Sequence, residues 1–128
     1  MNITQKLKYL YFWPYSRRQK DLLRIEPSRR ACCLDHYYSC EAKKKIAQIL
    51  QNEIHDESAI YIPGFQPTPT DSFADVYGIE QEDLLDMLER MEKKVSESSS
   101  LHRHSEQISI NTVGDVIEYF YSRTKHTQ

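Results

Sequence analysis

The strongest limit on the fold of this chain comes from the segment that runs from about Gln81 to Val95. Its main apolar residues recur at steps of four, three and four positions, the repeat of one face of an α-helix. These residues are Leu84, Leu88, Met91 and Val95, and Leu85 and Met87 widen the stripe. Acidic residues occupy the first turn and lysines the last, an order that complements the helix dipole. The segment is therefore predicted to be an amphipathic helix with one buried face.

Two further stretches have the same helical repeat. One begins near Glu41 and has the apolar residues Ile46, Ile49, Leu50 and Ile54. The other follows Thr112, which can cap a helix while Asp115 bonds back to the cap, and its apolar residues are Val113, Val116, Ile117 and Phe120. Because none of these helices would be stable alone, they must pack together. The sequence thus predicts an all-α fold with one core.

Proline defines the connection between the first two of these helices. The stretch Ile62–Thr70 contains three prolines and cannot continue a helix, so it is predicted to be a loop. A loop of this length must bury apolar groups to stay ordered, and we expect Ile60, Tyr61, Ile62 and Phe65 to fold back onto the core. The serine-rich stretch Ser96–Ser105, with His102 and His104, predicts a second, polar loop. Asp21–Glu26 is predicted to form a short helix ended by Pro27.

The first 40 residues differ from the rest in charge and composition. They hold eight Lys/Arg against three Asp/Glu and half of the aromatic residues, whereas residues 41–128 hold nine Lys/Arg against sixteen Asp/Glu. We therefore divide the chain into a basic, aromatic-rich N-terminal extension, residues 1–40, and a helical domain, residues 41–128. The extension either docks on the acidic domain or meets its own partner. Packing of its aromatics on protein is favoured over nucleic acid or an anionic membrane, so nucleic acid is not the expected partner.

Other classes of protein are disfavoured by what the sequence lacks. No apolar run approaches the roughly 18 residues of a transmembrane helix, and the first residues show no signal-peptide pattern, so a cytoplasmic location is expected. Cys32, Cys33 and Cys40 are odd in number and, with His36, match no standard zinc spacing. We expect no metal there, although the donors would suffice for one. No phosphate-binding loop or nucleophile motif is present, so we do not expect an enzyme.

Two segments of the domain resemble acyl carrier proteins. Residues 110–119, INTVGDVIEY, look like the family's final helix, which begins with Thr-Val and a nearby acidic residue. Residues 73–79, FADVYGI, look like the approach to its second helix. The order of elements is also similar: helix, long loop, acidic helix, variable loop and short helix. The resemblance implies a four-helix bundle with a long first loop, which carries acyl chains on a serine-linked phosphopantetheine arm in fatty acid, polyketide or related acyl metabolism.

The serine that the resemblance requires is not in its expected place. In the family it follows an aspartate and precedes a hydrophobic residue, two or three positions after a glycine equivalent to Gly78, and here Gln81 stands there. A glutamine amide is no nucleophile, so this register predicts no cofactor. In a second register Asp71-Ser72-Phe73 has the required order, and Ser72 would then carry 4'-phosphopantetheine. Otherwise Ser72 is a loop or capping serine.

Three functions follow from these observations. The leading prediction is a non-enzymatic, carrier-like domain that binds a basic protein partner through Glu82, Asp83, Asp86 and Glu89. The alternative is a working acyl or peptidyl carrier modified at Ser72. A third function would belong to the N-terminal extension, which would bind nucleic acid or an anionic membrane while the domain serves as a scaffold. Each carboxylate can also simply solvate an exposed helix face.

Overall fold

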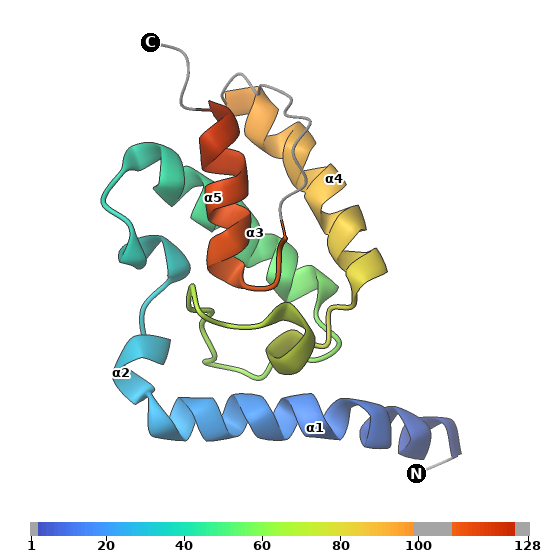
Figure 1. The fold of residues 1–128 in the computed structure, drawn as a ribbon. Helices are drawn as coiled ribbons and strands as arrows, with labels where there is room; N and C mark the ends of the chain where they lie inside the picture. Colours follow the sequence, from blue (N-terminus) through green and yellow to red (C-terminus); the bar gives the residue numbers. More distant parts are fainter. Residues whose placement is uncertain (1–2, 99–108, 125–128) are drawn as a thin grey trace.

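The computed structural model describes residues 3–98 and 109–124. Over these ranges the regular structure is helical, so the fold is all-α (Figure 1). The elements in chain order are α1 (Ile3–Ile25), α2 (Pro27–Arg30), the 3₁₀ turn η1 (Leu34–Tyr37), α3 (Glu41–Glu57), the π-helical turn η2 (Phe73–Tyr77), α4 (Gln81–Ser98) and α5 (Val113–Thr124). The only extended pairing in the described ranges is an isolated antiparallel bridge between Ser72 and Thr112.

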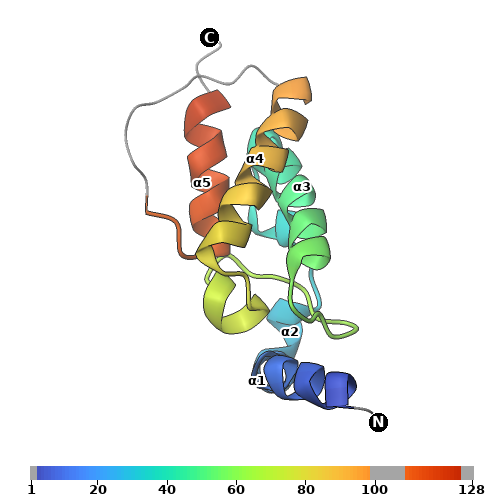
Figure 2. The same cartoon turned by 90° about the vertical axis from the view of Figure 1, so that its right-hand side faces the viewer.

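Three long helices form the body of the molecule. α3, α4 and α5 run alongside one another in two perpendicular views, and α3 contacts both of the others (Figures 1 and 2). α1 crosses beneath one end of this group, and the segment 58–79 lies between α1 and the three helices (Figure 1). The acidic helix α4 is therefore supported by α3 along one side.

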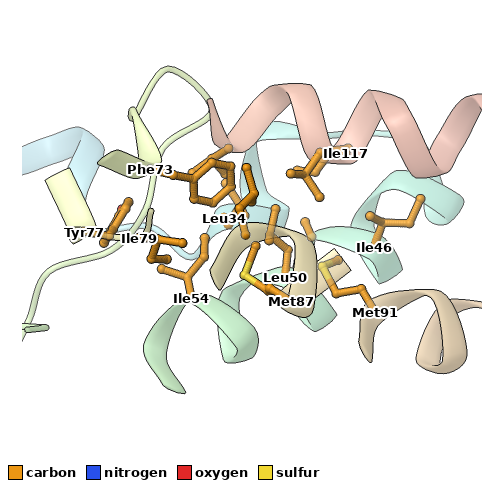
Figure 3. Close-up of a cluster of buried hydrophobic side chains, with 14 of the residues drawn as sticks. Leu34, Ile46, Leu50, Ile54, Phe73, Tyr77, Ile79, Met87, Met91 and Ile117 are labelled. Atoms are coloured by element: carbon orange, nitrogen blue, oxygen red, sulfur yellow. The ribbon is translucent and has the colours of Figure 1, made fainter. Parts of the chain in front are cut away.

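The three predicted apolar stripes form the core, although Ile49 and Leu88 are only half-buried against it. α3 contributes Ile46, Leu50 and Ile54, α4 contributes Leu84, Met87, Met91 and Val95, and α5 contributes Val113, Val116, Ile117 and Phe120 (Figure 3). Ile62 and Phe65 of the proline-rich loop are buried against this core and Tyr61 packs on it, as predicted. Ile60, which was expected with them, is half-buried beside α1 instead. Leu85 was expected to widen the stripe, and this was wrong, because its side chain is 54% exposed. At about 100° per residue, Leu85 turns away from the buried side that its neighbour Leu84 occupies.

The predicted cap of the last helix is also confirmed. Asp115 N donates to Thr112 Oγ1 at 3.3 Å, and Thr112 N donates to Asp115 Oδ2 at 3.0 Å, the reciprocal pair of a capping box. Asn111 N donates to the same carboxylate oxygen at 3.0 Å. α5 therefore begins where local chemistry predicts.

The N-terminal segment differs from its prediction. Instead of a short helix over Asp21–Glu26, one 23-residue helix, α1, runs from Ile3 to Ile25 with Pro14 inside it. Proline removes one backbone donor, and the helix continues because its buried face packs on segment 58–79. The first 40 residues also reach the rest of the chain through buried Gln19, Arg30 and Leu34. The domain boundary at residue 40 stays a prediction.

Gly78 makes the close approach of α1 to this segment feasible. Its φ of +66° lies in the left-handed region, where residues with a Cβ are strained. A Cβ built at this position would lie 2.9 Å from the Ala59 Cβ and 3.0 Å from the ring of Tyr15. A glycine is thus required both by the backbone and by the space left beside Tyr15.

The predicted second loop and its histidines are only partly covered by the described residues. α4 extends to Ser98, so the start of the stretch Ser96–Ser105 is helical rather than loop. His102, His104 and His126 lie outside the described residues. Across residues 3–98 and 109–124, none of the helices combines the length and the apolar character needed to cross a membrane.

Candidate partner-binding surface on α4

The four predicted partner-binding carboxylates lie together on the surface. Glu82, Asp83, Asp86 and Glu89 are all exposed in the first half of α4, and Leu85 lies exposed among them. We call these five residues the α4 acidic face. None of its carboxylates forms an ion pair with another residue of the described part of the chain. Their charge is therefore available to a partner.

Two of the three cations of α4, Arg90 and Lys94, turn the other way and hold the helix to α3, while Lys93 is exposed. Glu53 is buried on α3 and accepts a hydrogen bond from Arg90 Nε at 2.9 Å, and it also pairs with Lys94. Arg90 Nη2 reaches Glu57 Oε1 at 2.5 Å. Because these cations neutralise carboxylates of α3, they do not offset the charge of the α4 acidic face. Met87 and Met91, fully buried beneath, fix the rotation of the helix.

Ser72, the candidate attachment residue, and Gln81, which stands where the resemblance expects the serine, lie in different settings. Gln81 is the exposed first residue of α4, the place where the resemblance expects the serine. Ser72 is half-buried before the short turn η2, where its Oγ accepts a hydrogen bond from Asp75 N at 3.2 Å. This is the capping role that the sequence offered as its alternative. Of the two, only Ser72 carries a hydroxyl, and it precedes the short turn η2 rather than the long helix α4.

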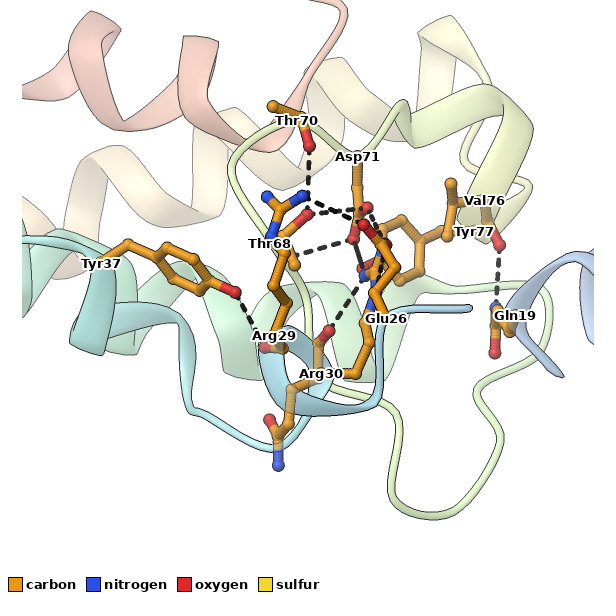
Figure 4. Close-up of polar contacts among 11 residues, drawn as sticks. Gln19, Glu26, Arg29, Arg30, Tyr37, Thr68, Thr70, Asp71, Val76 and Tyr77 are labelled. Carbon is orange, nitrogen blue, oxygen red and sulfur yellow. Dashed lines mark hydrogen bonds and ion pairs between the residues drawn. The ribbon is translucent and has the colours of Figure 1, made fainter. Parts of the chain in front are cut away.

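A buried polar cluster that the sequence did not reveal joins the N-terminal extension to the segment before α4 (Figure 4). Arg30 Nη1 and Nη2 donate to the two carboxylate oxygens of Asp71, each at 2.6 Å. Tyr77 Oη donates to Asp71 Oδ2 at 2.6 Å, and Thr68 adds donors from its backbone nitrogen and its hydroxyl, each at 3.0 Å. Both Arg30 and Asp71 are less than 5% exposed. We call these four residues the Asp71 cluster.

The surroundings of Arg30 complete its pairing. Glu26 Oε1 accepts from Arg30 Nη2 at 2.8 Å, and the guanidinium lies 4.5 Å above the ring of Phe65. The buried Arg30 cation thus has two carboxylates, the carbonyl oxygen of Gln66 and an aromatic face as partners. These partners replace most of the hydration that burial removes. The cluster therefore anchors segment 58–79.

Gln19 is a second buried anchor. Its side-chain nitrogen donates to the carbonyl oxygens of Ile60 at 2.9 Å and Val76 at 2.8 Å, and its oxygen accepts from Ile62 N at 3.0 Å. One fully buried amide thus satisfies three backbone groups of a segment that has no ladder of its own.

Burial also makes the structure sensitive to alkaline pH. Burial and the neighbouring Asp71 charge raise the pKa of Tyr77 well above its ordinary value of 10.0, and the same two causes raise the pKa of Tyr61 to about 12. Burial and the charge of Glu118 raise the pKa of Tyr38 to about 12. The folded chain therefore keeps phenol protons that the unfolded chain loses above pH 10.

The expected result is a free energy of unfolding that falls as pH rises from about 10 towards 12, because unfolding then releases protons. Below about pH 10 these phenols are protonated in both states and their contribution is constant. Urea denaturation at a series of pH values measures this free energy. Tyr77→Phe is the comparison, because its free energy of unfolding should fall less steeply at alkaline pH. Equal slopes for the variant and the wild type would contradict the role given to Tyr77.

The cysteine-rich stretch is separate from these features. Cys33 and His36 are exposed, Cys32 and Cys40 are half-buried, and all three cysteines are free thiols. In the described residues no three His, Cys, Asp or Glu side chains come together as a metal site would require.

The sequence predicted that the acidic residues of α4 would be exposed because helical spacing alone separates them from the buried stripe. It could not find the Asp71 cluster or Gln19, whose partners lie as far as 57 positions away. Comparison with known proteins adds no relative, because no protein-family model, no curated protein and no solved structure matches this chain.

Proposed function

We propose that this chain is a protein-binding module that docks a basic protein partner on the α4 acidic face. The observation that carries the proposal is the separation of charge on α4. Its first half presents four exposed carboxylates with no ion-pair partner among the described residues, while Arg90 and Lys94 are engaged with α3. Arg90 and Lys94 therefore leave the charge of these four carboxylates available to a cationic partner.

The energetics of such a surface require several contacts at once. An exposed ion pair contributes about 0.2–1 kcal/mol, so no single carboxylate would hold a partner. Leu85 adds apolar area that only a partner can bury, and a buried leucine contributes about 1.5–3 kcal/mol. The carboxylates then steer the encounter and set its salt dependence, while Leu85 supports the lifetime of the complex.

The finer fold that we propose is the carrier-like bundle of the sequence resemblance. The order α3, long connection, acidic α4 and capped α5 supports it, as does the position of Gln81 at the start of α4. In this proposal the module acts in the cytoplasm, next to enzymes of fatty acid or related acyl metabolism, without being an enzyme or bearing a prosthetic group itself.

A cationic amphipathic peptide composed of lysine and leucine residues is a suitable probe for the proposed docking. Its titration into ¹⁵N-labelled protein is expected to shift the amide signals of residues 82–89, and raised salt should weaken the binding. Glu82→Lys/Asp86→Lys should weaken it by at least roughly tenfold. The control Asp56→Lys/Asp75→Lys makes the same change in net charge at exposed positions outside α4. Equal loss in both variants would show that only net charge matters and would refute the proposal.

The alternative, a carrier modified at Ser72, has a direct test. Incubation with a broad-specificity phosphopantetheinyl transferase and coenzyme A, followed by intact-mass measurement, is expected to leave the wild-type mass unchanged. A mass gain that Ser72→Ala abolishes would establish the carrier function instead.

A further inference from the structure

A groove beside α1 is lined by apolar and basic side chains, and its basic residues are opposite in charge to the α4 acidic face. It has a volume of about 320 Å³ and is lined by Phe12, Trp13, Ser16, Arg17, Lys20, Asp21 and Ile60. Its lining combines the apolar side chains of Phe12, Trp13 and Ile60 with the cations Arg17 and Lys20. We call it the α1 groove.

The cations of the α1 groove are free to meet a partner. The one carboxylate in the lining, Asp21, lies 3.8 Å from Arg24 in an exposed pair. Arg17 lies 5.2 Å from the Trp13 ring, and neither Arg17 nor Lys20 forms an ion pair with any described residue. With Trp13, these residues are spaced by four and three positions and so form one stripe along α1. The groove suits an apolar side chain with carboxylates around it.

The α4 acidic face presents this arrangement. Leu85 is the one exposed large hydrophobic residue that lies outside α1 in the described ranges. Three carboxylates surround Leu85: Glu82 lies three positions before it, Asp86 one position after it and Glu89 four positions after it. Glu82 to Glu89 and Trp13 to Lys20 are both seven-residue steps on helices, so each stripe is about 10 Å long. Leu85 does not line the α1 groove of its own molecule.

We propose that the α1 groove receives Leu85 from a second copy of this chain, with Arg17 and Lys20 paired to the carboxylates around it. This inference rests on the proposed function and names its basic partner as α1 of another copy. The contact joins two different surfaces. Two copies can therefore form a closed dimer in which the contact occurs twice, or successive copies can each make it once and form an open chain.

Reciprocal charge reversal tests the pairing. Sedimentation velocity of the wild type at increasing concentration is expected to show self-association that weakens with salt. Arg17→Glu/Lys20→Glu and Glu82→Lys/Asp86→Lys should each weaken it at least roughly tenfold. A mixture of the two variants should associate again, because every α1–α4 contact between unlike copies then joins opposite charges. Arg18→Glu/Lys45→Glu, with equal charge change at exposed positions away from the groove, should associate as the wild type does.

Trp13 provides a local readout, because it is the chain's single tryptophan. Its emission should shift to shorter wavelength as the concentration rises, and Leu85→Ser should abolish the shift. All the substituted side chains are exposed, so folding should persist. A monomeric wild type, or a variant mixture that fails to associate, would overturn this inference, while the lysine-leucine peptide would still test the proposed function. Binding of a monomeric wild type to phosphatidylserine vesicles, lost in Arg17→Glu/Lys20→Glu, would assign the groove to lipid instead.

Discussion

Asp71→Ala is expected to lower the free energy of unfolding by about 3 kcal/mol or more, a large part of the stability of a domain this size. The substitution leaves the Arg30 guanidinium buried with only Glu26 as a charged partner. It also removes the acceptor for the hydroxyl of Tyr77 and for the two donors of Thr68. Each buried donor left without an acceptor costs about 1–3 kcal/mol. Urea denaturation followed by circular dichroism measures the loss.

Two comparison variants separate the cause of this loss. Asp71→Asn keeps the shape and an acceptor oxygen but removes the charge, so its loss should be intermediate. Asp56→Ala removes an exposed aspartate, 78% accessible, and should change stability by no more than about 0.5 kcal/mol. If Asp71→Ala unfolded at the same urea concentration as the wild type, the Asp71 cluster would not be the anchor described above.

Gln19→Glu is expected to destabilise the protein by about 2–4 kcal/mol at neutral pH, although it exchanges one amino group for an oxygen. The new carboxylate could still accept from Ile62 N, but it would face the carbonyl oxygens of Ile60 and Val76, to which the amide now donates. Burial and these oxygens would raise the pKa of the new carboxyl above its unfolded value. Its protonated form is therefore favoured in the folded state, and stability should recover as pH falls towards about 4.

The pH dependence makes this prediction specific. Gln19→Ala should also be destabilised, since it leaves three backbone groups without a partner, but its deficit relative to the wild type should not shrink at low pH. Asn52→Asp, at an exposed position on α3, serves as the control for the added charge. A Gln19→Glu deficit that stayed constant from about pH 7 to about pH 4 would show that the amide's donors are not what the site requires.

The parts of the fold that the sequence predicted are those governed by neighbouring residues. The helical repeats of α3, α4 and α5, the reciprocal Thr112–Asp115 cap and the proline-rich loop all depend on spacings of a few positions. α1 was missed because Pro14 indicates a break, and what keeps the helix intact is packing against residues some sixty positions later. Local pattern cannot report such a contact.

The candidate surfaces divide in the same way. The four carboxylates of the α4 acidic face were predicted because one helix carries them all. The α1 groove needed the structure, since Ile60 joins Trp13 and Arg17 only when segment 58–79 lies against α1. The exposure of Leu85 likewise needed the structure, in which Leu84 and Met87 are the buried residues of that turn.

The long reach of the two buried anchors affects how the chain acquires its shape during synthesis. Arg30 meets Asp71 across 41 positions and Gln19 meets Val76 across 57, so both acceptors leave the ribosome well after their donors. Domains generally fold as whole units, and here the nascent N-terminal helix lacks its docking site until residue 79 has emerged. Its arginines and aromatic rings are thus open to chaperones or nascent neighbours during that interval, and translation speed through residues 30–79 determines how long it lasts.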